Sequence, residues 1–203
     1  MRKITMVQYG CGKMSKFTMR YALEKGLKIL GAFDIDKSKV GKDISSIIDC
    51  EKPLNIKIKD AKDFDEFLQK HEVDIAVITT TSIFAENYPI YEICAKNGVN
   101  AISTCEEAFY AQNSNPKLTK KLDKIAKETG CTICGSGYQD VFWGNLISVL
   151  GGATHKIKTI KGKSSYNVED YGISLAKVHG AGLSPEEFEK EIASADEISD
   201  EER

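Results

Sequence analysis

The stretch Met6-Val7-Gln8-Tyr9-Gly10-Cys11-Gly12-Lys13-Met14-Ser15 joins a strand-like apolar run to a turn with two glycines near the start of the chain. A helix is expected after the turn, and a second strand closes on Asp34. Gly10 permits a tight turn, Gly12 lets backbone N–H groups approach a pyrophosphate, and the start of the following helix favours negative charge. These features predict a βαβ unit that binds NAD or NADP.

The glycine pattern is incomplete, because Ser15 stands where a third glycine is expected and must still let the helix pack closely on the strand. Asp34 is placed to accept hydrogen bonds from the adenosine ribose and to repel a 2′-phosphate, although Lys37 and Lys39 are near enough to tolerate one. The alternative is an ordinary glycine turn in an α/β protein that binds no nucleotide. The residues expected to contact the cofactor are Gly10, Cys11, Gly12, Lys13, Met14, Asp34, Thr79, Thr80 and Thr81.

Composition gives a second set of expectations. The chain has 203 residues, a net charge of −2 and 41% hydrophobic residues, as expected of a globular protein large enough for one domain and part of another. We take the small net charge to argue against nucleic acid as a partner. No apolar run approaches the ~20 residues needed to cross a bilayer, and Met1-Arg2-Lys3 leads into a strand rather than a signal peptide. We therefore expect a cytoplasmic protein without a membrane partner.

Six cysteines are scattered along the chain without the regular framework of a disulfide-rich secreted protein, so we expect free thiols. Cys131 and Cys134 spell CxxC within an apolar run. No second CxxC or histidine pair accompanies them, which favours buried strand cysteines over a zinc or redox site. We predict no metal.

Strand and helix signals alternate through the first two thirds of the chain. Strands are expected at 56–58, 73–78, 100–103 and 131–134, and helices at 63–71, 84–97 and 116–129. The helix after the glycine turn is marked by Met14, Phe17, Tyr21 and Leu23. The fold class predicted from this alternation is α/β, with a doubly wound parallel (Rossmann) sheet formed by a dinucleotide-binding domain over residues 1–135.

The pattern changes after residue 135. A helix is expected from Val141 to Leu150, an alternating strand from His155 to Lys163, and a helix start with a capping box at Ser184-Pro185-Glu186-Glu187. A single strand cannot satisfy its own hydrogen-bond ladder. We therefore interpret residues 136–203 as the start of an incomplete α+β substrate domain, and expect a homo-oligomer formed through its sheet.

Five segments carry a resemblance to a known family. They are Tyr9-Gly10-Cys11-Gly12-Lys13-Met14-Ser15, Gly31-Ala32-Phe33-Asp34, Ser103-Thr104-Cys105-Glu106-Glu107, Gly135-Ser136-Gly137-Tyr138-Gln139-Asp140-Val141-Phe142-Trp143 and Glu169-Asp170-Tyr171-Gly172. The chain resembles the 2,4-diaminopentanoate dehydrogenases of bacterial ornithine fermentation, which are grouped with dihydrodipicolinate reductase and diaminopimelate dehydrogenase-like proteins. Members of the family are longer, so we expect Arg203 to end the N-terminal part of such an enzyme, with little or no activity in isolation.

The resemblance implies an NAD- or NADP-dependent oxidative deamination of a small diamino acid, namely 2,4-diaminopentanoate to 2-amino-4-oxopentanoate. Two alternatives stay open. One is a dihydrodipicolinate reductase-like enzyme or another amino-acid dehydrogenase. The other is a nucleotide-binding fragment without catalytic activity.

Polar residues at strand ends are the candidates for the substrate site, because ligands of open α/β sheets bind there. The resemblance implies that Glu106 holds a substrate ammonium group, although a surface carboxylate at a helix start is as plausible. Tyr138 and Gln139 follow a glycine turn where nicotinamide and substrate should meet. Asp140 has a capping role as its alternative, and His179 could be an ordinary loop histidine. The catalytic candidates are Tyr138, Asp140 and His179.

Overall fold

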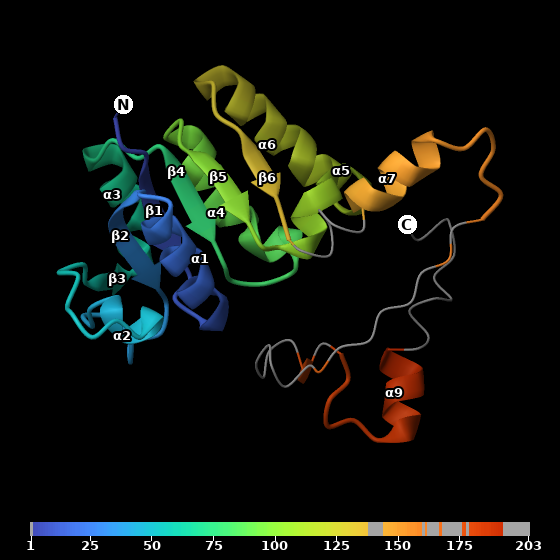
Figure 1. Ribbon diagram of the computed structural model, residues 1–203, viewed down its shortest axis with the longest axis horizontal. Coiled ribbons are helices and arrows are strands. Elements are labelled where there is room, and N and C mark those ends of the chain that lie inside the picture. Colours follow the sequence, from blue (N-terminus) through green and yellow to red (C-terminus); the bar gives the residue numbers. More distant parts are fainter. Residues whose placement is uncertain are drawn as a thin grey trace. The chain divides into compact units, whose positions relative to one another are not determined.

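The computed structural model describes residues 2–137, 144–159, 161, 167, 176–177 and 179–192 (Figure 1). Contacts divide the chain into two units, Met1–His155 and Lys156–Arg203, and each is described by itself. All the strands that follow belong to the first unit.

The first unit is built on a six-stranded parallel sheet in the order β3-β2-β1-β4-β5-β6. The strands are β1 (Thr5–Tyr9), β2 (Lys28–Asp34), β3 (Ile58–Asp60), β4 (Ile75–Ile78), β5 (Asn100–Ser103) and β6 (Ile133–Gly135). This is the doubly wound order of nucleotide-binding sheets, in which the connections reverse direction between β1 and β4. The predicted fold class is confirmed.

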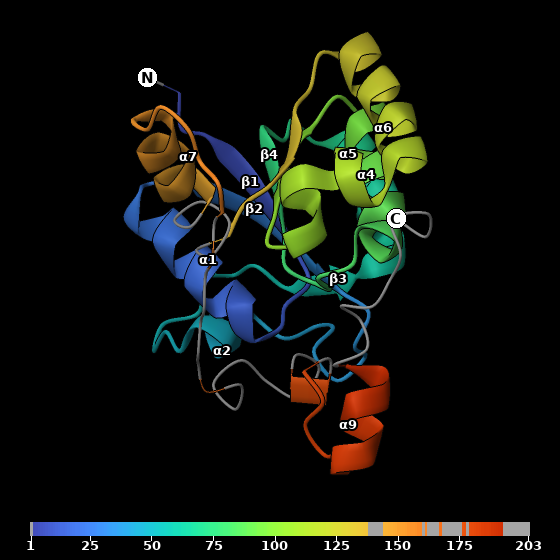
Figure 2. The same cartoon turned by 90° about the vertical axis from the view of Figure 1, so that its right-hand side faces the viewer.

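Helices cover both faces of the sheet, as Figure 2 shows. The described helices of this unit are α1 (Lys13–Glu24), α2 (Ser45–Ile48), η1 (Ala61–Asp63), α3 (Phe64–Lys70), α4 (Phe84–Lys96), η2 (Glu106–Tyr110), α5 (Ala111–Ser114), α6 (Pro116–Thr129) and α7 (Asn145–Gly152). Helices α1 and α2 pack on one face of the sheet, and α3, α4 and α6 pack on the other. Successive residues of β1 point to opposite faces: Met6 joins the apolar cluster under α1 and α2, and Val7 joins the one under α3, α4 and α6. The core therefore lies in two layers on either side of the sheet.

Helix α1 forms where the sequence predicts it, but most of its large apolar residues do not face the sheet. Met14, Phe17 and Tyr21 are exposed, and the buried positions are Ser15, Met19 and Ala22. The inner face thus combines two small side chains, Ser15 and Ala22, with the larger Met19. Ser15 is fully buried and its hydroxyl donates to the carbonyl oxygen of Gly12 at 2.6 Å, so it does replace the third glycine.

The part after β6 agrees only partly with expectation. Helix α7 begins at Asn145, and residues 138–143 before it lie outside the described part of the chain. Of the predicted strand His155 to Lys163, residues 155–159 and 161 are described and none of them is in a strand. The expected self-association through this segment stays a prediction, because the described residues do not include a strand edge that would test it.

In the second unit, helix α9 (Pro185–Glu191) begins as predicted. The Ser184 hydroxyl accepts a hydrogen bond from the backbone N–H of Glu187, and the Glu187 carboxylate accepts one from the backbone N–H of Ser184, which is a complete capping box. Of the helices in the described part of the chain, none has both the length and the apolar character that a bilayer crossing requires.

Candidate functional site

The turn after β1 is held against both neighbouring strands. Gly10 has a φ of +83°, and a Cβ atom at this position would lie 2.5 Å from the carbonyl oxygen of Thr79. Its N–H donates to the carbonyl oxygen of Phe33 at the end of β2. Only glycine combines this backbone conformation with this close approach, so Gly10 shapes the turn from β1 to α1 where it packs against the end of β4.

Gly12 differs from Gly10 in having open space around it. A Cβ atom at Gly12 would meet no atom within 4 Å. Gly12 is also the N-cap of α1, where no side chain caps the helix and the first turn contains no acidic residue. The start of a helix carries unsatisfied N–H groups and a partial positive charge. This end of α1 has both the room and the polarity to accept a phosphate group, so the residues present fit a dinucleotide.

Asp34 is buried at the end of β2 and binds the same turn. Its Oδ2 atom accepts a hydrogen bond from the N–H of Cys11 at 2.7 Å and lies 3.2 Å from Nζ of Lys39. Its Oδ1 atom accepts from the N–H of Asp36. Burial raises the pKa of the Cys11 thiol to about 12, and the charge of Asp34 adds to that shift, so this side chain stays neutral beside the turn.

The two lysines considered beside Asp34 have different partners. Lys39 lies within 3.6 Å of Oδ2 of Asp36 as well as facing Asp34. Lys37 forms an ion pair with Asp60 at the end of β3. Only Lys39 therefore faces the carboxylate at which the ribose is expected.

The threonines after β4 lie at the same edge of the sheet. Thr79 is buried, and its hydroxyl donates to the carbonyl oxygen of Gly10 at 2.9 Å. The hydroxyl of Thr80 donates to the side chain of the buried Asn87, and Thr81 accepts from Ile83 N–H at 3.3 Å. The N-cap residue of helix α4 is Ile83, which has no side-chain cap, so the preceding Ser82 does not cap this helix.

Two acidic residues, Glu106 and Glu107, follow β5, and their side chains have different surroundings. Glu106 is exposed at the start of η2. Glu107 instead accepts hydrogen bonds from the N–H of Phe84, at 2.7 Å, and from the side chain of Asn115. Glu107 thus stabilises the start of α4, a role the sequence did not indicate because Phe84 lies 23 residues away. Glu106 is left facing solvent near the expected ligand edge.

The described part of the chain does not test the remaining candidates. Tyr138, Gln139 and Asp140 lie outside the described residues. His179 belongs to the second unit, where it is exposed in a turn. Their predicted roles stay predictions.

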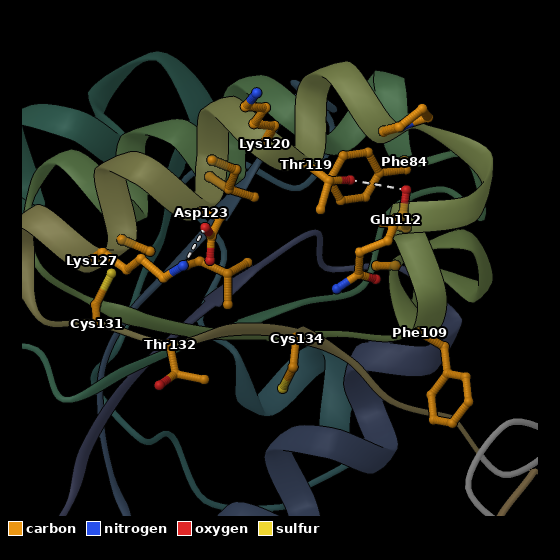
Figure 3. A pocket seen from close by; sticks show the side chains of 16 residues that line it. Phe84, Phe109, Gln112, Thr119, Lys120, Asp123, Lys127, Cys131, Thr132 and Cys134 are labelled. Atoms are coloured by element: carbon orange, nitrogen blue, oxygen red, sulfur yellow. Dashed lines mark hydrogen bonds and ion pairs between the residues drawn. The ribbon is translucent and has the colours of Figure 1, made fainter.

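A hollow of about 720 Å³ lies elsewhere in the first unit. It runs between α6 and β6 and is lined by Phe84, Leu122 and Ile133 together with polar side chains such as Lys127 and Gln112 (Figure 3). None of the predicted cofactor or substrate residues that the structure describes lines it. All six cysteines are free thiols, but the prediction of buried strand cysteines was wrong for the pair beside this hollow: Cys131 is half-buried and precedes β6, and Cys134 is exposed.

Two relatives match the expected resemblance. The sequence is 22% identical over 129 residues to 2,4-diaminopentanoate dehydrogenase from Acetoanaerobium sticklandii, which covers 63% of this chain and 36% of that protein. The structure matches amine dehydrogenase from Mycobacterium smegmatis with a TM-score of 0.87 and 36% sequence identity, over 98% of this chain and 58% of that chain. No protein-family model matches the sequence. The predicted resemblance to these dehydrogenases is confirmed, and the chain spans only part of each of them.

A third relative corrects an expectation. The chain is 31% identical over 103 residues to the redox-sensing transcriptional repressor Rex from Caldicellulosiruptor bescii, which covers 50% of this chain and 42% of that protein. From the net charge of −2 we expected that nucleic acid is not a partner. That expectation was wrong, because the chain is similar to a regulator of transcription. A whole-chain charge does not describe the local potential at which a partner binds.

Proposed function

We propose that this chain provides the NAD- or NADP-binding part of a dehydrogenase that oxidises the amine-bearing carbon of a small diamino acid. In this proposal residues 1–135 are the nucleotide-binding domain, and residues 136–203 begin the substrate domain. The observation that carries it is the open, uncapped start of α1 at Gly12, next to a turn that only glycine can form at Gly10. The amine dehydrogenase match over 98% of the chain supports the same reading.

The preferred substrate is 2,4-diaminopentanoate, as in the relative from Acetoanaerobium sticklandii, which would place the protein in ornithine degradation. The amine-bearing C4 loses a hydride, the amine nitrogen loses a proton, and water hydrolyses the resulting imine to 2-amino-4-oxopentanoate and ammonia. A bound nicotinamide supplies the hydride acceptor. The site must keep the reacting amine neutral and exclude bulk water until the imine forms.

Within this proposal, the cofactor-binding residues have separate tasks. The N–H groups of Gly12, Lys13 and Met14 would bind the pyrophosphate at the start of α1. Asp34 would accept hydrogen bonds from the adenosine ribose. The loop containing Thr80 and Thr81 would line the nicotinamide half.

The substrate and catalytic residues are proposed from the family resemblance. Glu106 is exposed at the ligand edge of the sheet, where its carboxylate would pair with a substrate ammonium group. Tyr138 and Gln139 would contact the substrate. Tyr138, Asp140 and His179 are the candidates for proton transfer.

A second candidate is a nucleotide-binding module that senses the cofactor without chemistry. The 31% identity to a redox-sensing repressor over 103 residues favours it, because that stretch is half of the chain. Both candidates share the cofactor site at Gly12 and differ only in whether a substrate is turned over.

An activity screen separates these functions. The purified chain is assayed for NADH and NADPH formation with 2,4-diaminopentanoate and meso-diaminopimelate, and for NADPH consumption with dihydrodipicolinate. From this chain alone we expect only trace deamination of 2,4-diaminopentanoate, with ammonia released in a 1:1 ratio to the reduced cofactor. Reduction of dihydrodipicolinate alone would contradict the substrate assignment. Cofactor binding without turnover of any substrate would favour the sensing module.

A further inference from the structure

Gln8 is a fully buried polar residue near the end of β1, in a strand that is otherwise apolar around it. Its side-chain Nε2 donates to the carbonyl oxygen of Gly10 at 3.0 Å and to the hydroxyl of Thr79 at 2.9 Å. Its Oε1 accepts from the hydroxyl of Thr18, in α1, at 2.9 Å. A buried amide costs stability unless such bonds satisfy it. Gln8 therefore links β1, the glycine turn, the end of β4 and α1.

The peptide unit between Gly10 and Cys11 is held at both ends. Its carbonyl oxygen accepts from Gln8 and from the hydroxyl of Thr79. Its N–H donates to Asp34 at 2.7 Å. The C=O and N–H of a trans peptide point in opposite directions. These bonds therefore fix the orientation of the peptide unit that leads directly into Gly12 and the start of α1.

We propose that Gln8 is a positioning residue that sets the glycine turn in its ligand-ready shape before the cofactor arrives, an inference that rests on the cofactor-binding function above. Gln8 acts through the Gly10 carbonyl and is itself buried beneath the turn. Holding a loop in its bound shape reduces the ordering cost of binding. Loss of the Gln8 amide should therefore weaken cofactor binding even though Gln8 touches no ligand.

Strands β1 and β4 are also linked by side-chain hydrogen bonds at their opposite end, which supplies a matched control. There the Thr5 hydroxyl donates to Oδ2 of Asp74 at 2.9 Å, and the Thr5 N–H donates to the same carboxylate at 2.7 Å. This network also joins the β1 strand to the start of β4, but at the edge away from the glycine turn. If Gln8 had a purely structural role, substituting Gln8 at one end of β1 and Thr5 at the other end should change NADH affinity equally.

The test uses Gln8→Leu and Thr18→Val at the turn, Thr18→Ser as the conservative variant, and Thr5→Val at the far end. NADH affinity is measured by fluorescence titration, thermal unfolding by circular dichroism, and amide hydrogen exchange at Cys11 on the ligand-free chains. Gln8→Leu should weaken NADH binding by roughly tenfold or more and speed exchange at Cys11. Thr18→Val should weaken NADH binding and speed exchange at Cys11 to a smaller degree. Thr18→Ser should keep both the affinity and the exchange rate close to wild type.

Thr5→Val should lower the unfolding temperature without changing either readout. Equal losses of NADH affinity in Gln8→Leu and Thr5→Val, or unchanged affinity in folded Gln8→Leu, would overturn the inference. If Gln8→Leu does not fold, the Thr18→Val and Thr18→Ser pair decides. If the wild-type chain does not bind NADH, the proposed function fails. In that case amide hydrogen exchange at Cys11 still tests the positioning role. Faster exchange in Gln8→Leu but not in Thr5→Val would support it, and unchanged exchange in Gln8→Leu would refute it.

Discussion

The carboxylate of Asp34 accepts a hydrogen bond from the backbone N–H of Cys11 at 2.7 Å, across the turn from the end of β2. The acid that we assign to the ribose therefore also holds the glycine turn in place. Removing its charge and removing its acceptor oxygens should have different consequences.

Asp34→Ala should reduce the preference for NAD over NADP, measured as the ratio of the two affinities. It should weaken the binding of both cofactors. It should also lower the free energy of unfolding by about 1.5–3 kcal/mol, because a buried charged acceptor is lost. Asp34→Asn keeps an oxygen for the Cys11 N–H, so it should narrow the ratio with a smaller loss of stability. Calorimetric titrations and denaturant unfolding measure both effects. A ratio that stays unchanged in both variants would place the ribose elsewhere.

Lys39 should determine how well a 2′-phosphate is tolerated, because its ammonium group lies 3.2 Å from Oδ2 of Asp34. Lys39→Met should reduce NADP affinity relative to NAD affinity by roughly tenfold, the effect of losing one charge-assisted contact. Lys37→Met is the control, since Lys37 is paired with Asp60. An equal effect of the two substitutions on the affinity ratio would argue against a specific role for Lys39.

Much of the fold could be predicted from the sequence because local signals agreed with the tertiary structure. Pro116 and Gly130 bound α6, and the apolar run before Thr79 forms a central strand. The inner face of α1 could not be predicted this way. Of the large apolar residues of α1, Met19 is fully buried whereas Met14, Phe17 and Tyr21 are exposed, and the rest of the inner face consists of the small side chains of Ser15 and Ala22.

The site was predictable only where a short motif carries its own geometry, as at Gly10 and Gly12. Hydrogen bonds between residues distant in sequence were not predictable. The Asp34 contact with Cys11, the Glu107 contact with Phe84 and the Gln8 contact with Thr79 all depend on which strands become neighbours. A polar residue within an apolar strand run, as at Gln8, is the one signal that could have indicated such a network.

Glu106 and Glu107 should respond differently to the same substitution. Glu107→Ala removes the acceptor for the N–H of Phe84 and should cost about 1 kcal/mol of stability, as the loss of a helix cap does. Glu106→Ala should leave the unfolding temperature unchanged and raise the KM for the diamino acid. Thermal unfolding and steady-state kinetics on both variants check this. An unchanged KM in Glu106→Ala would remove that residue from the substrate site.

The carboxyl group of Asp43 should make the stability of the first unit depend on pH. Burial alone would raise the pKa of Asp43, but hydrogen bonds from the N–H groups of Ser45, Leu54 and Ile56 outweigh it and lower the pKa from 3.8 to about 2. A lowered folded-state pKa contributes stability above the unfolded value, and that stability is lost as the pH falls through this range. Asp43→Asn should therefore be less stable than wild type at pH 6, with the difference shrinking between about pH 4 and pH 2. Denaturant titrations at several pH values measure this, and a pH-independent difference would refute it.

The central claim is that the open start of α1 binds a nicotinamide dinucleotide. Its most direct test is calorimetric titration of NADH into the wild-type chain and into Gly12→Val, with thermal unfolding of both. A Cβ atom at Gly12 meets no protein atom within 4 Å, so Gly12→Val should fold like wild type while its side chain occupies the space of the pyrophosphate. We expect saturable binding of NADH to the wild type and none to the folded variant. Unchanged NADH affinity in Gly12→Val would contradict it.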